Sequence, residues 1–295
     1  MERLRDFYTM NSFDAYAYKD YLHKIFEDRS KLSYISYNLI KGNKIIRTRV
    51  NDECKIFTNI SDISYPPNEC ARLDRASLKG KPMFYGSVFT HNNETIYLPR
   101  VVNLTETSNF FKDHNSGGRQ FITQSAWINN RTLNLAVLPI SHTYKQPCDE
   151  VRHMQKEIYE TAKKIGIGVS DKAIFLGDLF ARKNELNTYQ MTAHFVDYVL
   201  NESCDADYFD GVLYPSVPSE GIGMNLCIKP SLIDSGIVKC EGASLVMLIK
   251  DKMESKLSYL LDCDIVDNGE LLWRNSDMLE KAIQNPYLFN DLLNL

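Results

Sequence analysis

Apolar residues recur every three or four positions, the spacing of an amphipathic helix, in three stretches of the chain. They predict helices over residues 13–27, from Asp149 to about Gly166, and over residues 185–202. Asp149 is suited to cap its helix, because its side chain can accept a hydrogen bond from an unpaired backbone amide of the first turn. The tail of the chain also looks helical, with a break at Pro286.

Short runs rich in β-branched and aromatic residues, bounded by Gly, Pro and Asn, predict strands. Their order along the chain favours an α+β fold over a regular parallel βαβ array, because strands cluster instead of alternating with helices. The simplest organisation has a helical N-terminal extension at 1–44, one domain at 45–250, and a strand with a helical tail at 251–295. The predicted strands cover residues 45–50, 83–89, 121–127, 133–140, 211–216, 225–230, 243–250 and 256–263.

Composition and charge narrow the class of protein. The chain has 295 residues, 44% of them hydrophobic, so a sizeable core is expected. The net charge of -4 argues against a broad nucleic-acid interface, which needs clustered Lys and Arg. The N-terminus has no basic stretch followed by an apolar core, and no apolar run is long enough to span a bilayer. We therefore expect a cytoplasmic protein with no membrane partner. Seven scattered cysteines without a CxxC pair fit buried, reduced thiols.

Several kinds of catalytic site are not expected. The six histidines show no metal-ligand spacing, so no metal is predicted. Ser216 lacks the GxSxG turn of a serine hydrolase. A nuclease would need a carboxylate cluster for Mg²⁺, and the sequence has none that stands out.

Arg72, Arg75 and Tyr85 form the first candidate site. Both arginines lie in an irregular stretch just before a predicted strand, and Tyr85 lies toward the end of that strand. A loop arginine can clamp a phosphate through paired charge-assisted hydrogen bonds, and a nearby tyrosine can stack on a heteroaromatic ring. The alternative is two solvated loop charges and a half-buried strand aromatic.

Two further segments carry candidate residues. Glu106, in LTETS, could stabilise a developing cation or orient a ribose hydroxyl, or it could simply accompany a helix start capped by Thr105 or Thr107. Ser216 lies where a buried-looking strand breaks, and a Gly-containing loop then leads to Asn225. Such a loop lets backbone donors approach a ligand, although a plain surface hairpin would explain it equally well.

Together these segments resemble the RES-domain family, named for its Arg, Glu and Ser. The family pattern has an Arg, a short Gly-containing turn and a strand ending in Tyr, then a Glu in an LET-like setting, and last a DGIxYPS block followed by Gly and Asn. The matching pieces here are RASLKGKPMFYGS, LTETS and FDGVLYPSVPSEGIGMN. The resemblance covers roughly residues 45–250, and its third piece is the most specific.

The resemblance implies a fold and an activity. RES domains are similar to ADP-ribosyltransferases, compact α+β domains around a split central sheet. They act on NAD, degrading it or transferring ADP-ribose, and many are toxins neutralised by a cognate antitoxin. We therefore expect an NAD-consuming enzyme with NAD as substrate and an antitoxin as partner. A catalytically inactive nucleotide-binding or protein-interaction module of the same fold is the alternative.

Carried over by position, the resemblance makes Arg75, Tyr85, Glu106 and Ser216 the active-site residues. It leaves rivals open: the stretch HNNETIYLPR between Tyr85 and Glu106 looks inserted, so Glu94 competes for the carboxylate role. Arg49 and Arg72 are further candidates for binding an anion, as is Asn225 for binding NAD. In a separate hypothesis, the N-terminal extension inhibits the enzyme.

Overall fold

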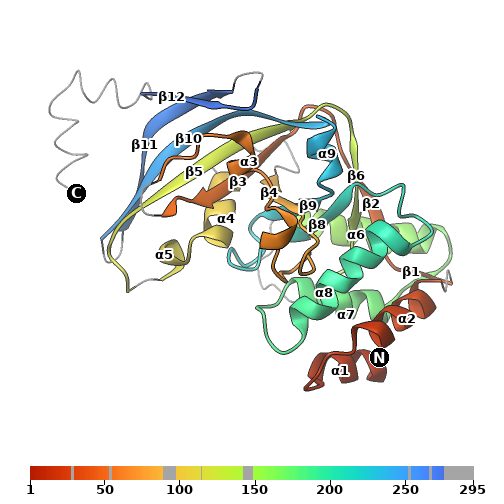
Figure 1. The fold of residues 1–295 in the computed structure, drawn as a ribbon. Helices are drawn as coiled ribbons and strands as arrows, with labels where there is room; N and C mark the ends of the chain where they lie inside the picture. The colour runs from red at the N-terminus through yellow and green to blue at the C-terminus, as the bar shows by residue number, and fades with distance from the viewer. Residues whose placement is uncertain are drawn as a thin grey trace.

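The computed structural model describes residues 1–27, 30–52, 55–88, 98–113, 115–141, 149–251, 254–265 and 268–275. In this part of the chain, helices flank a ten-stranded mixed sheet of order β12-β11-β10-β5-β3-β4-β9-β8-β6-β2 (Figure 1). Neighbouring strands are antiparallel except β6 and β8. The predicted α+β class is confirmed. The strands are β2 (Ile35–Leu39), β3 (Lys44–Val50), β4 (Phe84–Val88), β5 (Gly118–Asn129), β6 (Leu133–Val137), β8 (Gly211–Pro215), β9 (Met224–Ile228), β10 (Val238–Asp251), β11 (Glu254–Ile265) and β12 (Leu271–Asn275).

The helices lie in groups around this sheet (Figure 1). A separate two-stranded parallel sheet joins β1 (Lys31–Leu32) to β7 (Gly168–Val169). A π-helical turn, η3 (Tyr198–Glu202), continues α8 directly. The α-helices are α1 (Glu2–Thr9), α2 (Ala15–Phe26), α3 (Ile60–Ile63), α4 (Leu98–Thr107), α5 (Asn109–Lys112), α6 (Asp149–Lys164), α7 (Asp171–Phe180), α8 (Thr188–Asp197) and α9 (Ser231–Asp234).

The two N-terminal helices are part of the hydrophobic core. Leu4, Tyr18 and Leu22 are fully buried in a cluster that also contains residues of α7, α8, β8 and β9. Phe7 packs edge-on against Tyr18, with ring centroids 5.1 Å apart. Removing α1 and α2 would expose this apolar surface to water, which is unfavourable in proportion to its area. Deletion of residues 2–26 is therefore expected to destabilise the fold.

A second apolar cluster covers the other face of the central strands. Trp127 on β5 packs edge-on against Phe84 on β4, with centroids 4.9 Å apart. Leucine and isoleucine side chains of β6, β8 and β9 and the apolar side of α6 complete it. A third, smaller cluster joins α4 to β5 and β10 through Leu104, Ile122 and Val246. The sheet is thus covered on both sides where its central strands lie.

Strands β3 and β4 are joined by only a short pairing. Among the described residues, which end at Val88 on this strand, two pairs connect them: Ile45 with Val88 and Ile46 with Ser87. Two residues beyond the last pair, the amide of Thr48 donates to Oδ1 of Asn103 on α4, 2.5 Å away, instead of to a β4 carbonyl. Helix α4 therefore supplies the hydrogen-bond acceptor for β3 at the point where its pairing with β4 ends.

Arg47 bridges β3 and β4 on the opposite face of the sheet. Its Nη1 donates to the carbonyl of Tyr85 at 2.8 Å, and its guanidinium lies over the ring of Phe84. Burial and, to a smaller extent, the charge of the neighbouring Arg49 together lower the pKa of Arg47 to about 10. The two central strands are thus held by side chains from both faces beyond their short backbone pairing.

Most predicted elements are present, but several observed elements were not predicted. Among them are helices α1, α4 and α7 and strand β2. Two of the buried positions of α7 are the small residues Ala173 and Gly177, so its apolar stripe is weak in the sequence. The expectation of a helical tail is wrong for residues 271–275, which form β12 against β11 because Trp273 packs toward the core and donates to the carbonyl of Phe57. The break predicted at Pro286 lies outside the described residues.

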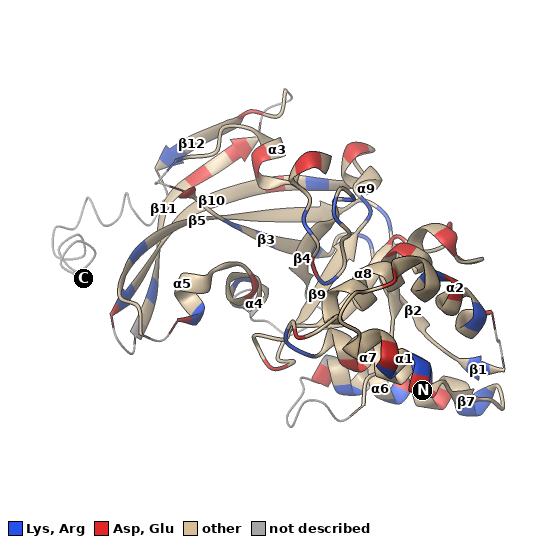
Figure 2. Ribbon diagram, turned by 60° about the horizontal axis from the view of Figure 1, so that its bottom comes forward, with Lys and Arg blue, Asp and Glu red and all other residues tan. Residues whose placement is uncertain are grey.

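Acidic and basic residues are interspersed over the described helices and loops (Figure 2). None of the helices that the structure describes is long and apolar enough to cross a membrane. The five cysteines in the described ranges form no disulfide. In the same ranges, no three His, Cys, Asp or Glu side chains are grouped as metal ligands.

Candidate functional site

Glu106 lies in the last turn of α4 and not at a helix start. Carboxylates are disfavoured there, because the C-terminal end of a helix carries partial negative charge. Two neutral donors compensate: the hydroxyl of Ser216 and the Nδ2 of Asn225 both donate to Oε1, at 2.7 and 2.5 Å. The partners are 110 and 119 residues away in sequence. A residue placed against its local preference and held by distant partners is typical of a functional site.

The Gly-containing loop after β8 presents Ser216 to this carboxylate. Ser216 is fully buried, its amide donates to the carbonyl of Gly223 at 2.8 Å, and its carbonyl accepts from Gly221 at 2.8 Å. Gly221 has φ of +80°, a conformation that other residues rarely adopt. A Cβ at position 223 would lie 2.3 Å from Cγ2 of Val102, so only glycine lets α4 approach this loop.

A chain of buried polar side chains holds Asn225 in turn. Asn225 on β9 is paired in register with Ser87 on β4, and its Oδ1 accepts from the Ser87 hydroxyl at 2.8 Å. Asn103 donates to the same hydroxyl oxygen at 3.1 Å. Asn103 and Glu106 are three residues apart, so they share one face of α4. Through Asn103 and Asn225, the network therefore connects the Glu106 carboxylate to both β3 and β4.

Arg75 is buried, not solvated. It is 7% exposed, and its Nη1 donates to the carbonyls of Leu179 and Phe180 at 3.3 and 2.9 Å. These carbonyls end helix α7, where a positive charge is favourable. The guanidinium also lies over the ring of Tyr189, 5.1 Å from its centroid. The arginine thus holds the loop before β4 against the end of α7.

Tyr85 ties its strand to the Arg75 loop. Its hydroxyl donates to Oγ of Ser77 at 3.0 Å and accepts from the amide of Ala76 at 3.1 Å. Burial raises the pKa of Tyr85 well above its ordinary value, and Cys227 and Asp74 add to this. The phenol is therefore neutral, and its hydrogen bonds are made to the loop, not to Glu106.

Two further tyrosines lie within electrostatic reach of both Arg75 and Glu106. Burial raises the pKa of Tyr214 well above its ordinary value. Cys227 and the negative charge of Glu106 raise it further, while Arg75 opposes them. Burial also raises the pKa of Tyr189; Arg75 opposes this shift, and Glu106 adds to it. Tyr189 and Tyr214 are therefore neutral phenols whose pKa values respond to both the arginine and the carboxylate.

The remaining sequence candidates lie elsewhere. Arg49 is on the β3 face opposite Thr48, where it bonds to the carbonyl of Asp62 and covers the ring of Phe57. Arg72 is exposed, and only its carbonyl takes part in the loop, by accepting from Ser77. Glu94 lies outside the described residues. The structure thus gathers Glu106, Ser216 and Asn225 directly, with Arg75 and Tyr85 in an adjoining group.

Sequence reasoning missed the residues that support this site. Asn103 and Ser87 carry no motif, although the position of Asn103 three residues before Glu106 is a usable signal. Tyr214 was inside the GVLYPS segment without being singled out, and Tyr189 lies on a helix predicted only from its apolar stripe. Comparison of the chain with protein-family models, with curated proteins and with solved structures finds no match.

Proposed function

We propose that this protein cleaves the bond between nicotinamide and ribose in NAD, as an enzyme of the RES-domain type. The observation that carries the proposal is the contact of Glu106 with Ser216 and Asn225. These residues come from two segments that resemble separate motifs of one family. A chance resemblance gives no reason for such segments to meet within hydrogen-bond distance.

The chemistry of the carboxylate fits this reaction. Breaking the nicotinamide–ribose bond builds positive charge on the ribose, and nicotinamide leaves as a neutral molecule, so no strong general acid is required. Glu106 supplies negative charge, and the donors Ser216 and Asn225 hold it in one orientation. A preorganised charge stabilises the transition state without the cost of reorganising solvent.

Arg75 and the tyrosines beside it supply the remaining functions in this proposal. The Arg75 guanidinium binds the pyrophosphate, in competition with the carbonyls of Leu179 and Phe180 that it contacts here. Tyr85 holds the Arg75 loop through Ala76 and Ser77. Aromatic rings next to a buried cation can also accept a heteroaromatic base by stacking.

An ADP-ribosyltransferase-like fold belongs to the same proposal. That fold implies a central sheet in two parts. The short pairing of β3 with β4, and the insertion of α4 at that point through Asn103, are compatible with it. The Glu106 carboxylate lies at this junction, where side-chain hydrogen bonds replace the backbone pairing between β3 and β4.

Nicotinamide release tests the proposal directly. Purified protein is incubated with NAD, with and without phosphate, and products are followed by chromatography. We expect release by the wild type and a loss of about 10²–10³-fold in Glu106→Gln, the usual effect of removing a transition-state contact. Glu69→Gln, at an exposed position of the short 3-10 helix Asn68–Cys70, is the matched control. Glu94→Gln distinguishes the rival carboxylate.

The outcomes separate the alternatives. Full activity in folded Glu106→Gln with loss in Glu94→Gln would transfer the carboxylate role to Glu94. No release by the wild type, together with no labelling of proteins from labelled NAD, would overturn NAD cleavage and favour an inactive nucleotide-binding or interaction module. Phosphate dependence would identify phosphate, not water, as acceptor.

A restraining partner follows from the proposed activity. A cell that makes an NAD-depleting enzyme must inhibit it, and the resemblance implies a cognate antitoxin that covers the site. We expect expression of the wild type alone to arrest growth and lower cellular NAD, and Glu106→Gln to do neither at equal protein level. Normal growth and unchanged NAD with active enzyme present would contradict the toxin assignment.

A further inference from the structure

A hollow of about 280 Å³ lies beside the loop that follows Arg75. Three segments enclose it: the loop 76–83, the helix α8 with its π-helical turn η3, and the turn 229–231. Met83 immediately precedes β4 and Lys229 immediately follows β9, whereas Ser87 and Asn225 lie toward the opposite ends of these strands. Four residues of strand correspond to about 13 Å. The hollow is therefore a separate place.

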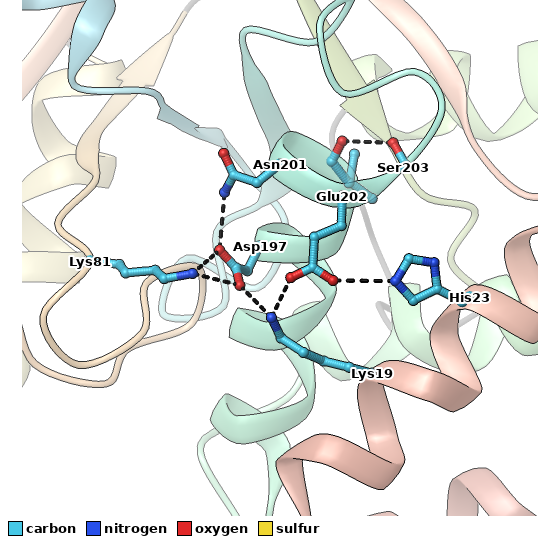
Figure 3. Close-up of polar contacts among 8 residues, drawn as sticks. Lys19, His23, Lys81, Asp197, Asn201, Glu202 and Ser203 are labelled. Carbon is cyan, nitrogen blue, oxygen red and sulfur yellow. Dashed lines mark hydrogen bonds and ion pairs between the residues drawn. The ribbon is translucent and has the colours of Figure 1, made fainter.

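The charged groups of the hollow are two lysines and one aspartate: Lys81, Lys229 and Asp197. Both oxygens of the Asp197 carboxylate are already bound. Oδ1 accepts from Lys81 and Asn201, and Oδ2 accepts from Lys19 and Lys81, at 2.8–3.0 Å (Figure 3). A cationic ligand would have to displace these donors. The charge that remains available to a ligand is positive.

Lys229 is the less compensated of the two lysines. Its Nζ donates to the backbone carbonyl of Ala206 at 2.8 Å, and no carboxylate among the described residues forms an ion pair with it. Burial lowers its pKa, although Asp210 and Asp207 act in the opposite direction. A half-buried ammonium group held by a neutral carbonyl can gain a charge-assisted hydrogen bond from an anion.

The rest of the lining is mostly apolar. Leu78, Met83, Val196 and Leu200 supply large side chains, and Ser77 and Ser231 supply hydroxyls. Leu200 belongs to η3, and π-helical turns are rare and are frequently found at functional sites. The volume is just below the usual range of about 300–1,000 Å³ for ligand pockets, which points to an occupant smaller than a dinucleotide.

We propose that this hollow binds a small organic anion, whose phosphate or carboxylate group contacts Lys229 and Lys81 and whose apolar part lies on Met83, Val196 and Leu200. The inference does not rest on the proposed NAD cleavage. An occupant would contact Ala76 and Ser77, which are hydrogen-bonded to Tyr85, so it would bind directly behind the loop that carries Arg75.

Met83 is a built-in reporter for this site. Protein with ¹³C-labelled methionine methyl groups is titrated with phenyl phosphate, benzoate and inorganic phosphate, and the Met83 signal is identified through Met83→Leu. We expect phenyl phosphate or benzoate to shift the Met83 signal saturably, and Lys229→Met to weaken that binding about tenfold or more. Lys229→Arg keeps the charge and should retain most of the affinity. Lys79→Met, at an exposed position of the same loop, should bind as the wild type does.

Each result decides a part of the proposal. Binding of phenyl phosphate alone identifies a phosphate ligand, and binding of benzoate as well shows that a carboxylate is accepted. An unmoved Met83 signal with both probes, or equal affinity in folded Lys229→Met, would overturn the site. Equal binding of inorganic phosphate would overturn the role of the apolar wall. Lys229→Met is preferred to a Lys81 variant because Lys81 neutralises the buried Asp197.

Discussion

The hydroxyl of Ser216 lies 2.7 Å from Oε1 of Glu106, although 110 residues separate them. Asn225 donates to the same oxygen. A carboxylate in the last turn of α4 thus has two donors: Ser216 from the loop between β8 and β9, and Asn225 from β9. Neither donor is charged. The two hydrogen bonds therefore restrict the position of the carboxylate without placing a positive charge on it.

If the protein cleaves NAD as proposed, Ser216→Ala should lower the rate of cleavage by about 10- to 150-fold. This range corresponds to the loss of a hydrogen bond to a charged group, about 1.5–3 kcal/mol. The effect should fall on kcat more than on KM, since the serine positions Glu106 and is not expected to bind the whole substrate. Steady-state kinetics of nicotinamide release measures both. Ser235→Ala, at an exposed position, should be unaffected, and equal kcat values for Ser216→Ala and wild type would remove this role.

Asn103→Ala should lower the free energy of unfolding by about 1–3 kcal/mol. The substitution leaves the buried amide of Thr48 without its acceptor and removes a donor to Ser87, and a buried group without a partner costs about that much. Urea unfolding followed by circular dichroism measures the change. Asn109→Ala, on the exposed side of α5, is the control. Equal unfolding midpoints for Asn103→Ala and wild type would show that α4 does not stabilise the strand junction.

Gly223→Ala should be destabilising because of one specific contact. The added methyl group would lie 2.3 Å from Cγ2 of Val102, which forces α4 away from the Ser216 loop. Overpacking of this kind typically costs about 1–3 kcal/mol. Val102→Ala removes the obstructing methyl groups, so Gly223→Ala should cost clearly less in that background. A double-mutant cycle of unfolding free energies tests this, and additive costs would contradict the contact.

His194 should make the protein less stable as the pH falls below about 6.5. Burial is the main cause that lowers the pKa of His194 in the folded state, and the positive charges of Lys19 and Lys81 lower it further. The negative charges of Asp197 and Glu202 partly oppose this shift. The unfolded state, with an ordinary pKa near 6.5, then binds protons that the folded state does not. His194 therefore does not lower the free energy of unfolding above pH 6.5. Below that pH, the free energy of unfolding decreases as the pH falls toward the folded pKa of His194.

His194→Phe isolates this effect. It keeps an aromatic ring beside Phe13, on which the imidazole is stacked at 5.7 Å, and it cannot titrate. The difference in unfolding free energy between wild type and variant should shift in favour of the variant from pH 7.5 to pH 5, while carboxylate contributions common to both cancel. Parallel stability profiles over this range would mean that His194 is protonated equally in both states.

Local sequence determined most strands of the large sheet and the helices α2, α6 and α8. The apolar spacing over 13–27 gave α2, the β-branched run at 45–50 gave β3, and the residues around Ser216 were recognisable as a strand followed by a Gly-containing loop. Such signals depend on the neighbouring residues only, because helix and strand periodicities are short. The resemblance also rested on short segments, each identified separately.

Tertiary structure decided which of these segments meet. Strand pairing sets Ser87 opposite Asn225, and the packing of α4 at the β3–β4 junction brings Glu106 to them, while strand alternation turns Arg49 to the other face. Trp273 lies in a strand because its segment pairs with β11 and its side chain packs toward the core, and not because of the residues beside it in the sequence. Register and packing join residues more than a hundred positions apart, and no local periodicity contains that information.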